Sequence, residues 1–348
     1  MQRNARSLLG VLTGAMVALG LTGQALAQNP PAPAPVKIRI AYVPVVGAAS
    51  VFVMAAAGWA REAGLDVSLV RFESGPPAIA ALASGTIDAM AIGVAPVAVA
   101  RAKGIDVKII AAASTGGSAL VARKPLADAL AAAGGDIASA IAALSKSLGR
   151  PVKLASVPAG GVPVVALNHY LFKLNHVARE QVQIVSMGID ATQQAVLTGA
   201  VDGGTLLEPT LTVALGKSAD LKILASADQM FSGIPGVVVA VRGEFMKSQP
   251  AAVDQFTALV VRANRSIEQS PQEAAAYSSA ILGGGLIDSP TLARAFTSGQ
   301  VKFVSNPAAI EEPTRRLLDY QAEIGDFDKA PPIDGLFDAG PYQRAAAK

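Results

Sequence analysis

Among its 348 residues the chain has no cysteine, two histidines and one tryptophan. It can therefore form no disulfide and carry no lipid on an N-terminal cysteine, so its stability must come from burial alone. A zinc centre would lack thiolate ligands, and the two histidines have no third ligand at a suitable spacing. Lysine and arginine are scattered along the chain rather than clustered, which argues against a nucleic-acid partner. We expect no metal, no cofactor and no nucleic acid.

Catalytic motifs are also absent from the sequence. It contains no G-x-S-x-G, P-loop or H-E-x-x-H pattern. His169 and His176 fall with Lys173 on one face of a predicted helix, opposite its apolar residues, which indicates a solvated stripe rather than a metal site. The glycine run 283–285 follows a helical pattern and not a strand, so it indicates a helix end. We therefore expect no catalytic residues and a protein that is not an enzyme.

The only long apolar run free of charge lies at the N-terminus. Arg3 and Arg6 precede the apolar stretch 8–21, and Ala25-Leu26-Ala27 has the small-x-small pattern of a cleavage site. The stretch is shorter than the roughly 20 residues that a membrane span needs. The pattern predicts a signal peptide over 1–27, cleaved after Ala27, and a periplasmic protein. Without Arg3 and Arg6 the chain has 27 basic and 26 acidic residues, a net charge of +1, which indicates no polyanionic partner.

After a proline-rich leader, residues 28–36, the sequence alternates strand and helix patterns. Strands are expected at 36–43, 65–72, 87–92 and 107–113, with helices at 50–63 and 76–84. The series restarts near Pro151, with strands at 152–157, 182–186 and 201–207 and helices at 162–177 and 190–198. A βαβ series of this kind predicts an α/β protein of two lobes, each with a doubly wound, mostly parallel sheet.

One short pattern occurs twice, as LASGTIDAM at 82–90 and VLTGAVDGG at 196–204. In both copies a helix ends before a glycine suited to a left-handed C′ position, and a strand follows. Asp88 and Asp202 begin these strands at the end away from the expected ligand, so we interpret them as structural. Ligands of open α/β sheets bind at the opposite, carboxyl ends of the strands.

Two β-branched runs, GSALVARK at 117–124 and IPGVVVAVR at 234–242, flank the second lobe and are interpreted as the crossing strands of a hinge. The first lobe then covers 37–118, the second 119–238, and a C-terminal helical part, 239–348, returns to the first lobe. Proline at 250, 271, 290 and 307 indicates four helix starts. Ser270 and Glu273 have the spacing of a capping box.

Three segments together resemble a known family: ESGPPAIAALASGTIDAMAIGVAP (73–96), GIDVKIIAAASTGGSALVAR (104–123) and AVLTGAVDGGTLLEP (195–209). They are similar to the periplasmic solute-binding proteins of sulfonate, taurine and nitrate ABC importers. The resemblance implies a two-lobed, type II periplasmic-binding fold. It also implies a monomer that closes over a small molecule and delivers it to an ABC permease at the inner membrane.

The candidate ligand-binding residues lie where strands end and helices begin, because unpaired backbone N–H groups there favour an anion. Gly160 and Gly161, before Pro163, fit this geometry best. Glu208 is either a contact for a ligand ammonium or a carboxylate satisfied by backbone N–H groups, and both interpretations stay open. The full set is Gly47, Ala48, Ser74, Gly75, Gly93, Val94, Ser114 and Thr115 in the first lobe, with Gly160, Gly161, Val162, Met187, Gly188 and Glu208 in the second.

A small organic anion suits these segments best, because they contain no lysine or arginine that can be placed with certainty and many small apolar residues. An aliphatic sulfonate is the best match. Nitrate, an aromatic carboxylate and a thiamine-precursor pyrimidine remain open as ligands, and a periplasmic sensor subunit remains open as a role. A pyrimidine-synthase branch shares the implied fold, but we expect it to need cysteine and histidine chemistry that this chain lacks.

Overall fold

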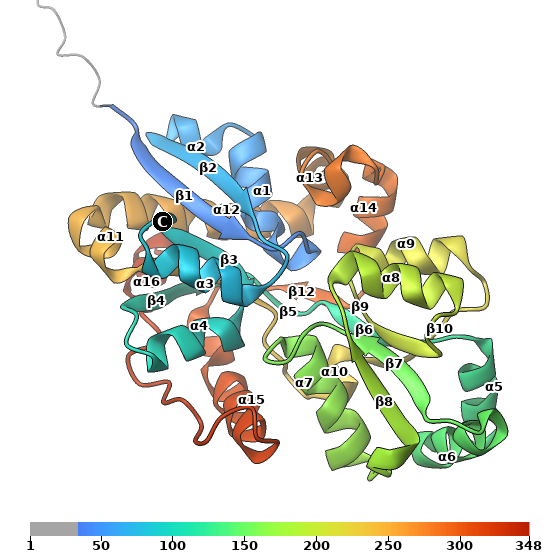
Figure 1. Cartoon of the computed structure of the whole chain (residues 1–348). Helices are drawn as coiled ribbons and strands as arrows, with labels where there is room; N and C mark the ends of the chain where they lie inside the picture. The colour runs from blue at the N-terminus through green and yellow to red at the C-terminus, as the bar shows by residue number, and fades with distance from the viewer. Residues whose placement is uncertain (1–33, 348) are drawn as a thin grey trace, which may run out of the picture. The chain divides into compact units, whose positions relative to one another are not determined.

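The computed structural model describes residues 34–347, so the predicted signal peptide and most of the predicted leader lie outside it. Two five-stranded sheets organise the described chain (Figure 1). The first has the order β2-β1-β3-β11-β4 and the second, read in the same sense, β8-β7-β9-β6-β10. The strands of the first sheet are β1 (Val36–Tyr42), β2 (Leu65–Arg71), β3 (Ala89–Gly93), β4 (Val107–Ala112) and β11 (Val237–Arg242). Those of the second are β6 (Ser118–Ala122), β7 (Val152–Ser156), β8 (Val182–Ser186), β9 (Gly203–Leu207) and β10 (Lys222–Ser226).

The two sheets share one topology. In the first, β1 pairs in parallel with β2 and β3, and β11 runs antiparallel between β3 and β4. In the second, β7 pairs in parallel with β8 and β9, and β6 runs antiparallel between β9 and β10. Each sheet therefore has four strands in one direction and one reversed. The repeated sequence pattern occupies equivalent places, since it leads into β3 in one sheet and into β9 in the other.

Both predicted hinge runs form strands, and the chain changes sheet at their N-terminal ends. The run 117–124 forms β6 and the run 234–242 forms β11, and these are the reversed strands of two different sheets. The chain crosses between the sheets just before each of them, at Ser114–Gly117 and at 233–236. There β5 (Ser114–Gly116) pairs with β12 (Val301–Phe303), and Thr115 forms a bridge with Pro235. β-Branched runs mark strands wherever they lie, so they could not show where the chain changes sheet. The predicted lobe boundaries stay a prediction.

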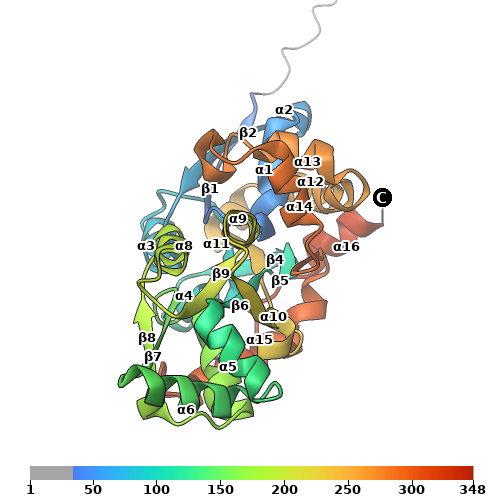
Figure 2. The same ribbon diagram turned by 90° about the vertical axis from the view of Figure 1, so that its right-hand side faces the viewer.

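Helices cover both faces of each sheet. α12, α13 and α14 pack near α1 on one side of the first sheet (Figure 2), and α3 and α4 belong to its other side. The first-sheet helices before the second sheet are α1 (Ala49–Ala56), α2 (Trp59–Glu62), α3 (Gly75–Ala83) and α4 (Val94–Ala102). Those of the second sheet are α5 (Lys124–Ala132), α6 (Ile137–Leu148), α7 (Val162–Asn168), α8 (Ile189–Thr198), α9 (Thr210–Lys217) and α10 (Ala227–Met230). The C-terminal helices are α11 (Gly243–Ser248), α12 (Pro250–Gln269), α13 (Pro271–Ser278), α14 (Ser289–Phe296), α15 (Glu311–Glu323) and α16 (Gly340–Ala346).

The core follows the alternation of the strands. In β11, Val237, Val239 and Val241 are buried against α1 and α12, while Val238 and Ala240 face the cluster that contains α4. Alternate residues of a strand point to opposite faces, so a strand covered on both sides reads as a continuous apolar run. This is why VVVAV contains no polar residue.

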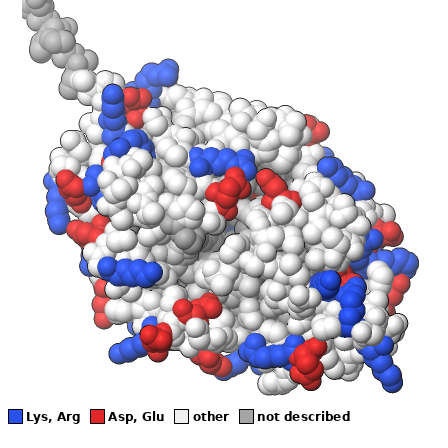
Figure 3. All heavy atoms as spheres, viewed as in Figure 1, with Lys and Arg blue, Asp and Glu red and all other residues white. Residues whose placement is uncertain are grey.

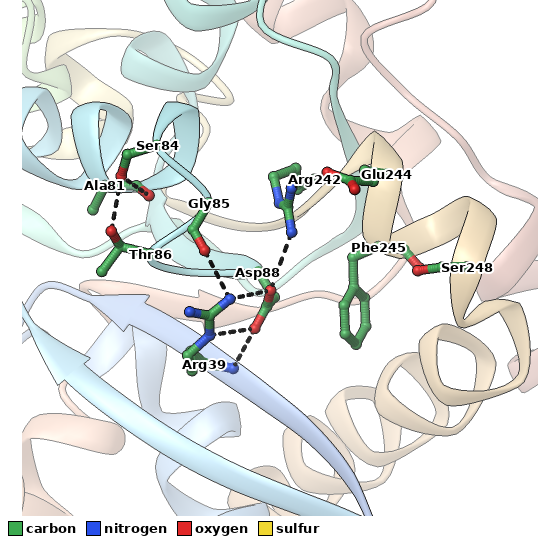
Figure 4. Close-up of polar contacts among 10 residues, drawn as sticks. All are labelled: Arg39, Ala81, Ser84, Gly85, Thr86, Asp88, Arg242, Glu244, Phe245 and Ser248. Atoms are coloured by element: carbon green, nitrogen blue, oxygen red, sulfur yellow. Dashed lines mark hydrogen bonds and ion pairs between the residues drawn. The ribbon is translucent and has the colours of Figure 1, made fainter.

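In each copy of the repeated pattern, an aspartate at the start of a strand pairs with an arginine, and we call this ion pair the corner. Figure 4 shows the corner at Asp88. The Asp88 carboxylate accepts hydrogen bonds from Nε and Nη2 of Arg39, at 2.9 and 2.8 Å, and from the backbone N–H of Arg39 at 3.0 Å. Nη2 of Arg242 lies 3.5 Å from the same carboxylate. Burial raises the pKa of Asp88, but the bonds and charge of Arg39 outweigh it, so the pKa lies below its ordinary value. The pair ties β3 to β1.

Two local predictions are wrong. Ser270 makes no side-chain cap to α13, and the capping box is instead formed by Ser226 and Gln229 at α10. His169 departs from the predicted solvated stripe, because it is half-buried, its Nδ1 lies 2.8 Å from the Met230 carbonyl oxygen and its ring packs between Phe231 and Tyr320. Lys173 and His176 of that stripe are exposed. Tyr320 comes from α15, and the pattern of one helix cannot show which distant segment covers it.

Candidate ligand-binding cleft

A cavity of about 570 Å³ opens where strand ends from both sheets meet. Ligand pockets of proteins have volumes of about 300–1,000 Å³, so the size suits a small organic molecule. A broad uncharged area occupies the middle of the molecular face in Figure 3, and lysine, arginine, aspartate and glutamate are interspersed around it. On that face no large patch of one sign appears.

The first sheet supplies its part of the lining from the carboxyl end of β3 and from the segments that follow β1 and β2. Residues of 43–47, 73–75 and 92–93 line the cavity there. The crossing segments add Ser114 and residues 116–118 from one side and Ile234, Gly236 and Val237 from the other. The site therefore lies at the carboxyl ends of the parallel strands, where open α/β sheets bind ligands.

The second sheet supplies three segments in the equivalent places. Residues 157–163 follow β7, Gly188 and Ile189 follow β8, and Leu207 ends β9. Gly160 has φ +81°, and no atom lies within 4 Å of the position that a Cβ would take. At Gly161 a Cβ would lie 2.7 Å from Cγ2 of Val157, so a side chain there would disturb the loop.

Most of the predicted binding residues border this cavity. Those in its lining are Gly47, Ser74, Gly75, Gly93, Ser114, Gly160, Gly161, Val162 and Gly188. The remaining five, Ala48, Val94, Thr115, Met187 and Glu208, are outside the lining. Ala48 and Val94 are fully buried in the core, and Thr115 pairs with Lys302 in the small sheet. The expectation that ligands bind where strands end and helices begin indicated these segments. It could not indicate which side of a helical turn faces the cavity.

Ser114 has a structural contact as well as a place in the lining. Its Oγ accepts a hydrogen bond from the backbone N–H of Val237 at 3.1 Å, which joins the two crossing segments. Gly47 and Gly236 leave room for this hydroxyl, because a Cβ at either position would lie within 2.7 Å of Oγ. The glycines thus permit a close approach of three segments at the floor of the cleft.

Glu208 is buried, with 1 % of its surface exposed. Its carboxylate accepts hydrogen bonds from the backbone N–H and the Oγ1 of Thr212, at 3.1 and 2.9 Å. Burial raises the pKa of Glu208, although hydrogen bonds from Thr212 and Ser298 oppose the rise. Its backbone connects the sheets, since its N–H donates to Gly117 and its carbonyl accepts from Val46. Of the two open interpretations, these contacts match the satisfied carboxylate.

Several lining residues were not predicted. They include the charged residues Glu73, Lys103 and Asp326 and the aromatic Phe327. Lys103 comes seven residues after Pro96 at the end of α4, so helical spacing offered a signal for it. Asp326 and Phe327 follow α15, far along the chain, and no sequence pattern placed that segment beside the cleft.

Within residues 34–347, no group of three or more histidine, cysteine, aspartate or glutamate side chains could hold a metal ion. In the same range we find no helix with the length and apolar character needed to span a membrane.

The fold and the cleft define a class, the two-lobed α/β binding proteins, and comparison with known proteins gives the family. The model of the NMT1-like family matches residues 31–283, and the chain belongs to this family. It is 28 % identical over 219 residues to the taurine-binding periplasmic protein of Escherichia coli strain K12. That match covers 61 % of this chain and 61 % of the relative's length.

Solved structures show the same fold at low sequence identity. The periplasmic nitrate-binding protein NrtA from Synechocystis PCC 6803 matches with a TM-score of 0.74 and 15 % identity, over 90 % of this chain and 89 % of that one. The aliphatic sulphonate binding protein SsuA from Escherichia coli matches with a TM-score of 0.67 and 16 % identity, over 87 % and 92 %. The predicted fold class and the predicted resemblance are confirmed.

Proposed function

We propose that the protein is the substrate-binding component of an ABC import system and binds a small organic anion in the cleft between its two sheets. The observation that carries the proposal is the position of the cavity, which strand ends of both sheets and both crossing segments enclose. Membership of the NMT1-like family and the likeness to a taurine-binding protein support this role. The protein would act in the periplasm, after cleavage at Ala27, and hand its ligand to a permease.

An aliphatic sulfonate remains the best candidate ligand. The named relatives bind taurine, nitrate or aliphatic sulfonates. Nitrate would leave a mostly apolar cavity of about 570 Å³ nearly empty, so it suits this cleft less well. We assign binding to the predicted residues that border the cavity, which are Gly47, Ser74, Gly75, Gly93, Ser114, Gly160, Gly161, Val162 and Gly188.

Binding is expected to close the cleft, because a ligand between two lobes is fully enclosed only when they approach. The crossing segments 114–117 and 233–236 are the places where backbone rotation would allow this. Small-angle scattering should show a smaller radius of gyration with saturating ligand. An unchanged radius would argue against closure while leaving binding in place.

A thermal-shift screen of the purified protein, followed by calorimetric titration, tests the function. The panel contains alkanesulfonates, taurine, nitrate, aromatic carboxylates and pyrimidines. A true ligand at 100 times its Kd should stabilise the folded protein by about 2.7 kcal/mol, which raises Tm by several degrees. A panel in which no compound raises Tm or gives a heat of binding would contradict the proposal.

A further inference from the structure

We propose that the cleft takes an organic anion tail first, with the apolar body along α4 and against Phe327 and the charged group at the mouth beside Lys103. The proposal rests on the proposed function and specifies the kind of anion and its orientation. An anion with an extended apolar body is favoured over one as small as taurine.

One face of α4 forms a long wall of the cavity. Gly93, Pro96, Val99 and Lys103 all line it, and residues three or four apart share one face of a helix. Lys103, which directly follows α4, comes seven positions after Pro96, a rise of about 10 Å along an α-helix. Ile79 of α3 borders the same cavity. The wall is therefore elongated and apolar, with its one charged residue at one end.

Charge is confined to the mouth of the cleft. Glu73, Lys103 and Asp326 are the charged residues of the lining, and all three are exposed. Among residues 34–347, Lys103 makes no ion pair, whereas Glu73 pairs with Arg71 at 3.0 Å. An anion deep in the cleft would meet backbone N–H groups and serine hydroxyls but no cationic side chain, so the loss of its hydration would be less well offset than beside a lysine. At the mouth it keeps water and gains Lys103.

Prolines reduce the number of backbone donors inside the cleft. Pro96 and Pro163 lie in the first turns of α4 and α7 and line the cavity. Proline has no N–H, so each presents a ring where another residue would present a donor. A Cβ at Gly75 would lie 2.5 Å from Cγ of Pro96, so the start of α3 packs directly on this ring. The interior suits an apolar body better than an oxyanion.

Phe327 closes this wall from the C-terminal part of the chain. The turn before it is fixed by the buried Gln321, whose carbonyl accepts from the Asp326 N–H at 2.9 Å and whose side chain donates to the Asp326 carboxylate at 3.2 Å. α15 packs against both α4 and α7. This segment lies beyond residues 31–283, which the family model matches. Phe327 thus lines the cavity from outside the segment that the family model matches, and we assign it to the apolar body of the ligand.

Calorimetric titration of ethanesulfonate, butanesulfonate, hexanesulfonate and octanesulfonate tests the orientation. Affinity should rise about fourfold with each added methylene that enters the cleft. Phe327→Ala should weaken octanesulfonate about tenfold and leave ethanesulfonate unchanged, and Phe327→Leu should restore most of the loss. Phe172→Ala is the matched control, because Phe172 is a partly buried aromatic outside the lining. Melting curves confirm that each variant is folded.

The mouth is tested by changes of charge. Lys103→Gln should weaken every sulfonate about two- to fivefold at low salt, and Asp326→Asn should strengthen them by a similar factor. Lys217→Gln, on the exposed end of α9, is the control and should change nothing.

Three results would overturn the proposal and leave the binding function standing: an affinity independent of chain length, a Phe327→Ala loss equal for all chain lengths, or charge effects that are absent or reversed. If no sulfonate binds and no compound of the screening panel raises Tm, the proposed function itself fails, and this proposal fails with it.

Discussion

The two sheets are stabilised by the same corner, with different arginines. Asp88 is held by Arg39 from within β1, and Arg242 approaches as a second cation. Asp202 is held by Arg150, which precedes β7, at 2.7 and 2.9 Å. The Asp88 side chain is 6 % exposed and the Asp202 side chain 16 %. The position of the carboxylate is preserved, while the origin of the cation is not.

Backbone hydrogen bonds explain why the carboxylate, and not the arginine, occupies the same place in both corners. The N–H of Arg242 donates to the Asp88 carbonyl, and the N–H of Arg123 donates to the Asp202 carbonyl, so these arginines occupy equivalent places. The side chain of Arg123 turns instead to the Val196 carbonyl at the end of α8, at 3.3 Å. The repeated pattern therefore encodes a joint between strands. The proposed binding cleft lies at the other ends of the same strands, where the two sheets differ in sequence.

The largest effect is expected when the corners are broken. Asp88→Ala should lower the free energy of unfolding by about 3 kcal/mol, because it leaves two arginines without their buried partner. Asp202→Ala should lower the free energy of unfolding by about 2 kcal/mol, because only one arginine loses its partner and the Asp202 carboxylate is more exposed than that of Asp88. Urea unfolding of both variants measures the difference. An equal or larger loss for Asp202→Ala would contradict the ranking of the two corners.

A change at the cleft should do the opposite and reduce binding without reducing stability. At Gly188 no atom lies within 4 Å of the position that a Cβ would take, φ is −66°, and the residue lines the cavity. Gly188→Asp should weaken binding of the sulfonate found by screening at least about tenfold, because the added side chain enters the lining and blocks the ligand.

Gly216→Asp is the matched control, because Gly216 in α9 has equally open surroundings and lies outside the lining. Its affinity should equal that of the unchanged protein. Equal affinities for both variants would remove Gly188 from the site.

A smaller effect is expected in acid, where protonation of the two corner carboxylates should lower the stability of the fold. The pKa values of Asp88 and Asp202 lie below the ordinary value, because bonds to arginine outweigh the effect of burial. As the pH falls, these carboxylates take up protons in the unfolded chain first, at about pH 3.9, and in the folded protein only at lower pH. The stability that they contribute above about pH 3.9 is therefore lost as the pH falls through their pKa values in the folded protein. Glu208, whose pKa burial raises, contributes in the opposite direction.

Urea unfolding at pH 7 and pH 3 measures this dependence. Asp88→Asn should make the loss of stability between the two pH values smaller, because the variant has no carboxylate to protonate at this corner. An unchanged loss would show that Asp88 does not link proton uptake to unfolding.

The smallest effect is expected for an exposed pair near the cleft. Arg71 lies between Glu73 and Asp190 of α8, and the Asp190 side chain is 70 % exposed. Asp190→Asn should change the free energy of unfolding by less than about 0.5 kcal/mol, because solvent screens such pairs. A loss as large as that of Asp202→Ala would mean that surface charge, and not the buried corners, holds the sheets.

Strand and helix patterns predicted much of the fold because they depend on local chemistry. Strand 182–186 was placed as it occurs, and the predicted strand at 152–157 became β7. The predicted helix 50–63 breaks at Gly58, which has φ +79°, into α1 and α2. The points where the chain changes sheet and the environment of His169 were not predicted, because both depend on contacts between segments far apart in sequence.

The cleft was predicted in part for the same reason. Gly93 ends β3 and Gly160 follows β7, and both lie at the carboxyl ends of strands, where ligands of open α/β sheets bind. Phe327 and Asp326 line the cavity only because α15 packs between α4 and α7, which is a tertiary contact without a local signature. Ala48 satisfied the rule and is nonetheless buried, because the rule fixes a turn and not the face of that turn.

Hydrogen exchange with and without the bound sulfonate tests most directly whether the corners hold the fold and the opposite strand ends bind ligand. Ligand should slow amide exchange at 114, in 116–118, in 159–162, at 188–189 and at 326–327, all of which border the cavity. Exchange at the corners, 85–88 and 199–202, should keep its rate. Protection at the corners without protection at the cleft segments would contradict the account.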